Sequence, residues 1–277
     1  MERYQSGNYK IVRNITRHYS TSFSLGISLL PLKTRNAIYA IYAFVRYADE
    51  IVDTLYDYNP SKLLMDYRNQ VNEALENKIS HHPVLDAFQD TVHKYQIPYE
   101  YIDAFLYSME MDLTAKEFTK KELDQYIYGS AEVVGLMCLY VFEPDKEKIK
   151  KLIEPARALG SAFQKVNFLR DVSSDYLERG RIYFPKEYYG NDFRSDECKK
   201  RFEAEIEADF ALALTGIQQL PEVIKVGVYA AYLFYKKLFK KIQGQPAAEL
   251  FKRRFRINNF QKSWVVSRCL VYDRFLL

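Results

Sequence analysis

The sequence predicts an all-α protein, and three observations support this fold class. Glycine (10) and proline (9) make up 19 of 277 residues, too few turn-forming residues for a fold of many short strands. Apolar side chains recur with a helical period in nearly every segment. The chain is 48% hydrophobic and 16% aromatic, so it can bury a large core. We therefore expect a single domain over residues 1–277 with roughly nine to eleven helices.

Local signals in the first half of the chain predict where helices begin. Residues 35–54 keep a helical period without a breaker. Asn59 is suited to cap a helix that begins at Pro60, because its side chain accepts backbone N–H bonds and proline fits the first turn. Thr119 and Glu122 have the spacing of a capping box at the start of a further helix.

Prolines and glycines predict the boundaries in the second half. Pro155 is expected to break or kink a long helix, because proline lacks the backbone N–H, so a new helix should run over residues 156–176. Residues 177–191 contain two glycines and a proline and should form the longest irregular connection. Later boundaries are expected at Pro221 and Pro246.

Cysteine usage and hydropathy indicate the compartment. The three cysteines (Cys138, Cys198 and Cys269) lie far apart and lack CxxC spacing, which favours a reducing compartment and neither a disulfide framework nor a zinc site. The longest run without charge, residues 19–32, has 14 residues, fewer than the ~20 needed to span a membrane. The polar N-terminal stretch lacks a signal-peptide core. We expect a cytoplasmic protein.

Positive charge is concentrated near the end of the chain. The formal net charge is only +4, which predicts no strong affinity for nucleic acid, but residues 236–256 carry eight cations and one acid. This segment could face anionic lipid or a phosphorylated substrate, or form an ordinary solvated helix face. For peripheral association with anionic lipid, the candidate residues are Lys236, Lys237, Lys240 and Lys241.

Two expected helices carry acid pairs on a polar stripe. In the first, Tyr42, Arg46, Asp49 and Asp53 are spaced by four, three and four residues, so they fall within roughly a 60° wedge of the helix. An ordinary amphipathic helix would not place two acids and an arginine on one stripe among Ile, Phe, Val and Ala.

The second helix repeats the pattern with different residues. Gln164, Asn167, Asp171 and Asp175 share roughly an 80° wedge, while Arg170 points away from it and is given a weaker role. A single DxxxD pair is a weak signal, but two pairs extended by polar residues favour a functional site.

Acid pairs on two helices suit one chemistry in particular. Mg²⁺ prefers oxygen ligands and bridges carboxylates to substrate phosphates, which reverses the repulsion between carboxylates and a diphosphate. A di-iron site is disfavoured because none of the four histidines has Glu-x-x-His spacing. Glycine-rich phosphate loops of the GxxxxGK[ST] or GxGxxG type are absent.

With these two acid-bearing segments, the sequence resembles the head-to-head trans-isoprenyl diphosphate synthases, the family of phytoene, dehydrosqualene and squalene synthases. It looks most like the bacterial phytoene synthases. The matching stretches occur in family order and span most of the chain: YSTSFSLGISLLP (19–31), YAFVRYADEIVD (42–53), YIYGSAEVVGLM (126–137), FQKVNFLRDVSSDYLERGRIYFP (163–185) and FKRRFRI (251–257). The resemblance implies an isoprenoid-synthase helical bundle with a central hydrophobic cavity.

The resemblance also implies roles for individual residues. Mg²⁺, with Mn²⁺ as an alternative, would be held by Asp49, Asp53, Asn167, Asp171 and Asp175. Tyr126 would lie near the reacting carbons or the departing diphosphate. Contacts with the substrate diphosphates would come from Ser20, Ser22, Tyr42, Arg46, Gln164, Arg181, Tyr183 and Arg254.

Several of these residues could instead have a purely structural role. Ser20 and Ser22 would suit a helix N-cap, and Tyr126 and Tyr183 would suit a buried core. Arg181 and Arg254 would also suit an exposed surface. The chain departs from the family pattern at Glu50, which is expected to lie off the stripe, and at Glu132. An unpaired charge beside an apolar cavity is costly, so Glu132 should point away or form an ion pair.

The implied activity is the condensation of two geranylgeranyl diphosphates to phytoene through a cyclopropylcarbinyl diphosphate, in carotenoid biosynthesis. The main alternative is the use of farnesyl diphosphate to make dehydrosqualene or squalene; the sequence contains no recognisable nicotinamide motif, so NADPH is not expected. A mono-substrate terpene cyclase and a non-enzymatic helical assembly protein are further alternatives. The first should lack the NFLRDVSSD–GRIYFP combination, and the second should have lost aspartates. Oligomeric state cannot be read from the sequence.

Overall fold

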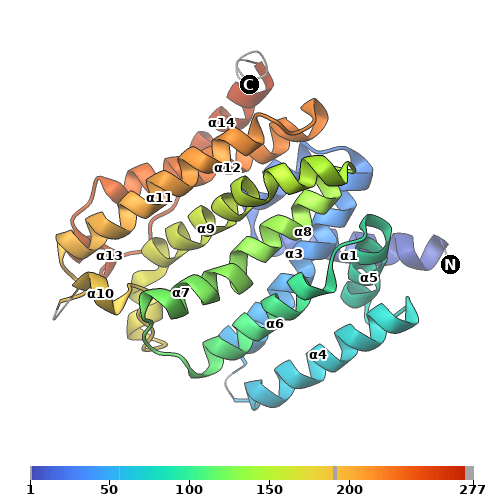
Figure 1. Ribbon diagram of the computed structural model, residues 1–277, viewed down its shortest axis with the longest axis horizontal. Helices are drawn as coiled ribbons and strands as arrows, with labels where there is room; N and C mark the ends of the chain where they lie inside the picture. Colours follow the sequence, from blue (N-terminus) through green and yellow to red (C-terminus); the bar gives the residue numbers. More distant parts are fainter. Residues whose placement is uncertain (1, 56, 190–191, 272–277) are drawn as a thin grey trace.

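The computed structural model describes residues 2–55, 57–189 and 192–271, and helices make up most of them (Figure 1). The first eight α-helices are α1 (Glu2–Tyr19), α2 (Thr21–Ser28), α3 (Leu32–Asp53), α4 (Pro60–Asn77), α5 (Pro83–Tyr95), α6 (Tyr99–Thr114), α7 (Lys120–Ile127) and α8 (Val133–Phe142). They are followed by α9 (Lys146–Leu177), α10 (Lys186–Tyr189), α11 (Asp196–Ile217), α12 (Glu222–Gln243), α13 (Ala247–Leu250) and α14 (Asn259–Val271). A π-helical turn, η1 (Tyr128–Glu132), joins α7 to α8. The all-α prediction is confirmed.

The long helices surround a common interior. Helix α9 packs against α11, α8 and α12, and α3 packs against α1, α5 and α8. In Figure 1, α11 and α12 lie along one side of the molecule and α4 and α6 along the other, with α8 and α9 between them. The two acid-bearing helices, α3 and α9, therefore belong to different packing layers around the same interior.

Capping residues act as the sequence predicted. The Asn59 side chain accepts a hydrogen bond from the backbone N–H of Lys62 at the start of α4. Thr119 and Glu122 form a complete capping box at the start of α7. Proline precedes the first residue of α12 and of α13, at Pro221 and Pro246.

The prediction that Pro155 breaks a helix is wrong, because α9 is continuous from Lys146 to Leu177. Close packing accommodates the proline ring: a Cβ atom built on Gly216 of α11 would lie 2.3 Å from the Cβ of Pro155. Gly216 thus lets α11 approach α9 at the proline, and the tertiary contact outweighs the local preference of proline for a helix start. The number of helical segments also exceeds the expected nine to eleven, because α10 and α13 are short and η1 separates α7 from α8.

The described part of the predicted irregular connection, residues 177–189, follows the prediction: α9 ends at Leu177, and the short α10 is the one helical turn after it. Gly180 has φ of +64°, a conformation that side chains with a Cβ rarely adopt. This turn reverses the chain directly after α9, and the backbone N–H of Arg181 donates to the carbonyl of Asp175 at 2.8 Å. The reversal brings Arg181 and Tyr183 back over the end of α9.

Candidate active site

A cavity of about 600 Å³ opens at one end of α9 and runs between the long helices. Its mouth is polar and includes the acid pairs of α3 and α9. Its deeper wall is apolar, with lining residues that include Ile38, Val134, Cys138, Leu139, Phe142, Leu152, Leu159, Ile217 and Leu220. Leu152 and Asp171 are 19 residues apart on one helix, so the cavity extends about 28 Å along α9.

The predicted site residues come together at this cavity. All of the residues named from the sequence line it except Ser22, which is half-buried and lies outside the lining. Tyr42, Arg46, Asp49 and Asp53 project from α3, and Gln164, Asn167, Asp171 and Asp175 project from α9. Ser20 caps α2, accepting a hydrogen bond from the backbone N–H of Phe23, and also lines the mouth. Ser20 thus combines a capping position with a position in the site.

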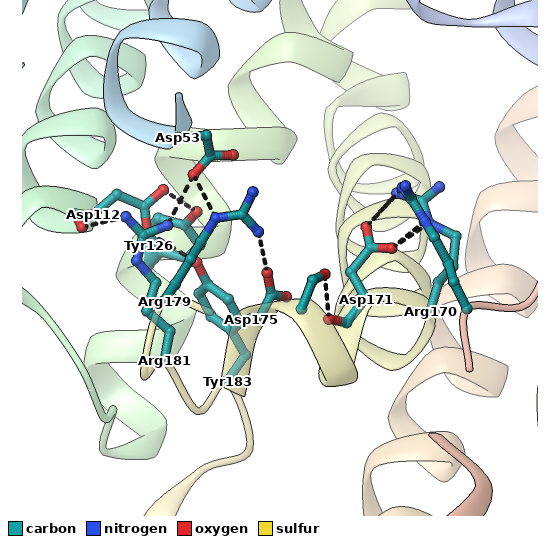
Figure 2. A network of polar contacts seen from close by, with 11 residues as sticks. Asp53, Asp112, Tyr126, Arg170, Asp171, Asp175, Arg179, Arg181 and Tyr183 are labelled. Carbon is teal, nitrogen blue, oxygen red and sulfur yellow. Dashed lines mark hydrogen bonds and ion pairs between the residues drawn. The ribbon is translucent and has the colours of Figure 1, made fainter. Parts of the chain in front are cut away.

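Two arginines bridge the acid pairs. The Arg179 guanidinium lies 2.8 Å from Asp175 and 3.6 Å from Asp53, so it joins α9 to α3. Arg181 is buried and donates to Asp53 at 3.0 Å. Figure 2 shows Asp53 reaching toward both arginines, above Asp175. These guanidinium groups offset the negative charge of the carboxylates.

A buried acid, Asp112 of α6, organises the aromatic side of the mouth. It accepts hydrogen bonds from the hydroxyls of Tyr126 at 2.6 Å and Tyr183 at 3.0 Å. Arg181 donates to its backbone carbonyl at 2.8 Å. The rings of Tyr183 and Phe168 stack with centroids 4.1 Å apart. The orientation of both phenols therefore depends on one carboxylate (Figure 2).

Asp171 is held by a second pair of arginines. Arg254 approaches it at 2.7 Å and Arg170 at 2.6 Å. Arg254 comes from the segment after α13, so the C-terminal part of the chain contributes a cation to the mouth. Arg170 lines the cavity and pairs with Asp171, so the expectation that it points away from the stripe is wrong, while its weaker role stays a prediction. A long guanidinium side chain reaches around the helix, which the direction of its Cα–Cβ bond does not reveal.

The amides of α9 form a continuous polar row. Asn167 donates to the side-chain carbonyl of Gln164 at 3.4 Å, and Gln164 donates to the hydroxyl of Ser130 at 3.4 Å. The Tyr235 hydroxyl donates to the side-chain oxygen of Asn167 at 3.2 Å. These contacts connect α9 with η1 and α12 beside the acid pairs.

The environment shifts the pKa values of three carboxyl groups. Burial raises the pKa of Asp49 to about 7, and the nearby Asp53 adds to this while Arg46 opposes it. Burial, assisted by Asp171, raises the pKa of Asp175 to about 7. Burial also raises the pKa of Asp112 to about 6, against the opposing effect of Arg181. A cation entering the mouth would therefore stabilise the ionised carboxylates.

The donor atoms at the mouth fit Mg²⁺ held jointly with a diphosphate. In the described part of the chain, no three His, Cys, Asp or Glu side chains come close enough to enclose a metal alone. Mg²⁺ needs no such cage, because it commonly uses one or two carboxylates and completes its shell with water and substrate phosphates. Crowded carboxylates with raised pKa values provide the hard oxygen ligands that this ion, or Mn²⁺, prefers.

Both departures from the family pattern have a structural explanation. Glu132 forms an ion pair with Arg157 at 2.7 Å, as the cost of an unpaired buried charge predicted. Glu50 lies off the cavity and forms an ion pair with Arg46. Glu50 therefore steadies a residue of the stripe without entering the mouth.

Sequence reasoning missed Asp112 and Arg179. Asp112 had a detectable signal, since it follows Ile102, Phe105 and Met109 on the same buried face of α6, where an acid is unexpected. Arg179 had none, because it lies just after α9 and its position depends on the turn at Gly180.

Comparison with known proteins agrees with this architecture. The family model described as squalene/phytoene synthase matches residues 16–261. A phytoene synthase of Arthrospira platensis is 31% identical, with 93% of this chain and 91% of that protein covered. A 4,4'-diapophytoene synthase of Staphylococcus haemolyticus is also 31% identical, but the alignment includes only 65% of this chain and 62% of that protein.

Solved structures share the fold. A dehydrosqualene synthase in complex with ligand has a TM-score of 0.84 at 22% identity, with 99% of both chains covered. Squalene synthase HpnC of Alicyclobacillus acidocaldarius has a TM-score of 0.76 at 22% identity, with 91% of this chain and 97% of that one covered. Since the family model covers most of the sequence and the fold agrees, this chain belongs to the squalene/phytoene synthase family.

Proposed function

We propose that this protein condenses two molecules of geranylgeranyl diphosphate head to head and forms phytoene. One observation carries the proposal: a deep apolar cavity opens at a mouth that presents two facing acid pairs together with five arginines. Such a mouth suits two diphosphates, and such a depth suits two long hydrocarbon chains. The single all-α domain expected from the sequence would work as one unit.

The chain's own residues divide the work between charge and orientation. Arg170, Arg179, Arg181 and Arg254 would hold diphosphate oxygens, because guanidinium groups bind such anions in a fixed geometry. Asp49, Asp53, Asn167, Asp171 and Asp175 would hold Mg²⁺ or Mn²⁺, which when bound neutralises the diphosphates and favours their departure. Tyr126, fixed by Asp112, would lie near the reacting carbons or the departing diphosphate, and Tyr183, fixed by the same acid, would contact the diphosphates.

The apolar wall would protect the carbocations. Loss of one diphosphate leaves an allylic cation, which the 2,3-alkene of the second molecule attacks with loss of a proton. The resulting cyclopropylcarbinyl diphosphate ionises in turn, rearranges and loses a proton to give the triene. Water would quench these cations, so the apolar lining below the mouth excludes it. Aromatic faces near the mouth, such as Phe168, would stabilise passing positive charge.

The choice of a C20 substrate rests on the relatives. Proteins with the name phytoene synthase match at 31% and 30% identity over more than nine-tenths of this chain. The relative with the name 4,4'-diapophytoene synthase covers 65% of it. Condensation of two farnesyl diphosphates to dehydrosqualene is therefore the second candidate, and we expect no need for NADPH.

A product assay tests the proposal. The purified protein is incubated with Mg²⁺ and either geranylgeranyl or farnesyl diphosphate, with and without NADPH, and the products are identified by mass spectrometry. We expect phytoene from the C20 substrate without NADPH and no product after chelation of the metal. Dehydrosqualene as the main product, with no phytoene, would contradict the chain-length assignment, and no condensation of either substrate would contradict the reaction itself.

A variant tests the role of the acid pairs. Arg170 and Arg254 form ion pairs with Asp171. The substitution Asp171→Asn keeps the size of this side chain but removes its charge. We expect kcat/KM to fall at least about a hundredfold while helicity is unchanged. Glu249→Gln, which changes a half-buried acid outside the cavity lining that is paired with Lys252, is the control and should keep full activity.

The substrates carry long hydrocarbon chains and the product is a hydrocarbon, so both partition into membranes, and we also expect a cytoplasmic protein that associates peripherally with a bilayer. In the described residues, no helix is both long enough and apolar enough to cross one.

A further inference from the structure

The surface around α14 combines exposed aromatic rings with a high density of cations. Phe260 is 81% exposed and Trp264 is 50% exposed, and they lie four residues apart on one side of the helix. The segment from Lys236 to Val271 contains ten Lys and Arg residues and one acid, Glu249. An apolar patch ringed by one sign of charge is unusual on a monomer surface and marks a site of interaction.

Contacts between α12, α14 and their connection define this surface. The Lys237 ammonium lies 4.8 Å from the centre of the Trp264 ring, and the Arg268 guanidinium lies 5.5 Å from it. Lys241 donates to the backbone carbonyl of Arg256 at 2.8 Å. We use the name α14 face for the group Lys237, Lys241, Arg256, Phe260, Trp264 and Arg268.

The four lysines singled out from the sequence separate into two pairs. Lys237 and Lys241 face α14 through the contacts with Trp264 and Arg256. Lys236 instead contacts the Phe210 ring of α11, at 4.8 Å, and Lys240 lies one turn further on that side of α12. Only the first pair belongs to the α14 face.

The α14 face lies next to the mouth of the cavity. Lys262 of α14 donates to the hydroxyl of Thr21, which directly follows Ser20 of the mouth. Arg254, which binds Asp171 in the mouth, is two residues before Arg256. Substrate chains that leave a bilayer beneath this face would therefore reach the cavity without crossing bulk water.

We propose that the α14 face docks the protein on the surface of a bilayer that contains anionic lipids. Phe260 and Trp264 would enter the interface between headgroups and acyl chains, where amphipathic aromatic rings are favoured. Lys237, Lys241 and Arg256 would contact anionic headgroups. A bilayer satisfies both kinds of side chain at once, and the neighbouring apolar cavity favours it over a nucleic acid.

Vesicle co-sedimentation in the absence of substrate tests docking separately from the reaction. The full-length protein is mixed with vesicles of phosphatidylcholine alone or with about one third phosphatidylglycerol. We expect binding to the anionic vesicles only, weakened by salt. Two double variants, Lys241→Glu with Arg256→Glu and Phe260→Ser with Trp264→Ser, should each weaken binding at least about tenfold.

Matched controls lie on α4 and the residues that flank it, at the opposite end of the molecule from α14 in Figure 1. Lys62→Glu with Lys78→Glu changes the net charge by the same amount at exposed positions. Tyr58→Ser with Met65→Ser removes two side chains that are 68% and 57% exposed. Both controls should bind vesicles as the unchanged protein does.

Several outcomes would overturn the proposal. The first is equal vesicle binding by the α14-face variants and the controls. The second is that the protein binds a fluorescent oligonucleotide but not vesicles. The third is that the protein is a dimer in solution and that the α14-face variants dissociate it. Condensation of substrate dispersed in detergent is measured for all variants. Retained condensation with lost vesicle binding supports docking, whereas loss of both together with a lowered melting temperature in both α14-face variants would count against it.

Discussion

At the scale of single residues, Asp112 is a group on which several contacts of the mouth converge. Two tyrosine hydroxyls and a guanidinium meet at this residue, which is 6% exposed. Burial raises the pKa of its carboxyl to about 6, compared with about 3.9 in an unfolded chain. Between these values the folded protein holds a proton that the unfolded chain has lost, so the free energy of unfolding falls as pH rises from about 4 to about 6.

Asp112→Asn should remove this contribution to the pH dependence. We expect the free energy of unfolding of the metal-free protein to fall between pH 4 and pH 6 by on the order of 2 kcal/mol more than that of the variant. Urea unfolding at several pH values measures the difference. Asp57→Asn, at an exposed position, should leave the pH dependence unchanged, and an identical slope in Asp112→Asn would contradict the assignment.

At the scale of helices, close approach of α9 to η1 depends on a glycine. A Cβ atom built on Gly160 would lie 2.4 Å from the carbonyl oxygen of Ala131 and 3.0 Å from the Cα of Glu132. Both neighbours are backbone atoms, so the helices would have to separate. Gly160→Ala should therefore lower the stability by about 1–3 kcal/mol.

A second glycine is the matched control for this helix packing. Gly7 lies in α1 with nothing within 4 Å of a Cβ atom at its position. Because alanine is the better helix former, Gly7→Ala should raise the stability by up to about 1 kcal/mol. Thermal unfolding followed by circular dichroism compares the two, and equal melting temperatures would show that the α9–η1 contact tolerates extra volume.

At the scale of the whole molecule, the far end of the cavity should decide the length of the substrate. Cys138 of α8 lines this end, three residues beyond Gly135, whose own Cβ would meet the carbonyl of Ala156 at 2.7 Å. Cys138→Phe fills part of the apolar end without changing the mouth. We expect kcat/KM for the C20 substrate to fall at least about tenfold more than kcat/KM for the C15 substrate.

A small substitution at the same position separates the effect of added side-chain volume from the effect of losing the thiol. Cys138→Ser removes the sulfur but adds no bulk, so the ratio of the two kcat/KM values should stay near that of the unchanged protein. Unchanged kcat/KM for both substrates in Cys138→Phe would mean that neither chain reaches Cys138, and equal losses for both would mean that this position does not select the chain length.

Much of the fold and the site could be predicted because the relevant information is local. Helical period, capping residues and the four-residue spacing of the acids each depend on a few neighbouring positions, and α3, α4 and α7 begin or run as expected. The spacing on α3 and α9 predicted which side chains share a stripe, and the cavity is lined by both stripes. Ser22 is the exception among the predicted residues, since α2 turns it away from the lining.

The contacts that the sequence did not predict occur where distant segments meet. Pro155 stays inside α9 because Gly216 of another helix makes room for its ring. Arg170 and Arg254 meet at Asp171 although 84 residues separate them in the sequence. Neither contact has a local signature.

The sequence by itself therefore determined the helical class, the family and the two acid stripes, because periodicity and motif spacing are properties of single helices. Only the tertiary structure decided how the stripes are balanced. The turn at Gly180 returns Arg179 and Arg181 to Asp53, and Asp112 of a third helix fixes both tyrosines. Long charged side chains take their partners from whichever segments pack nearby, and the packing of the whole chain sets which segments those are.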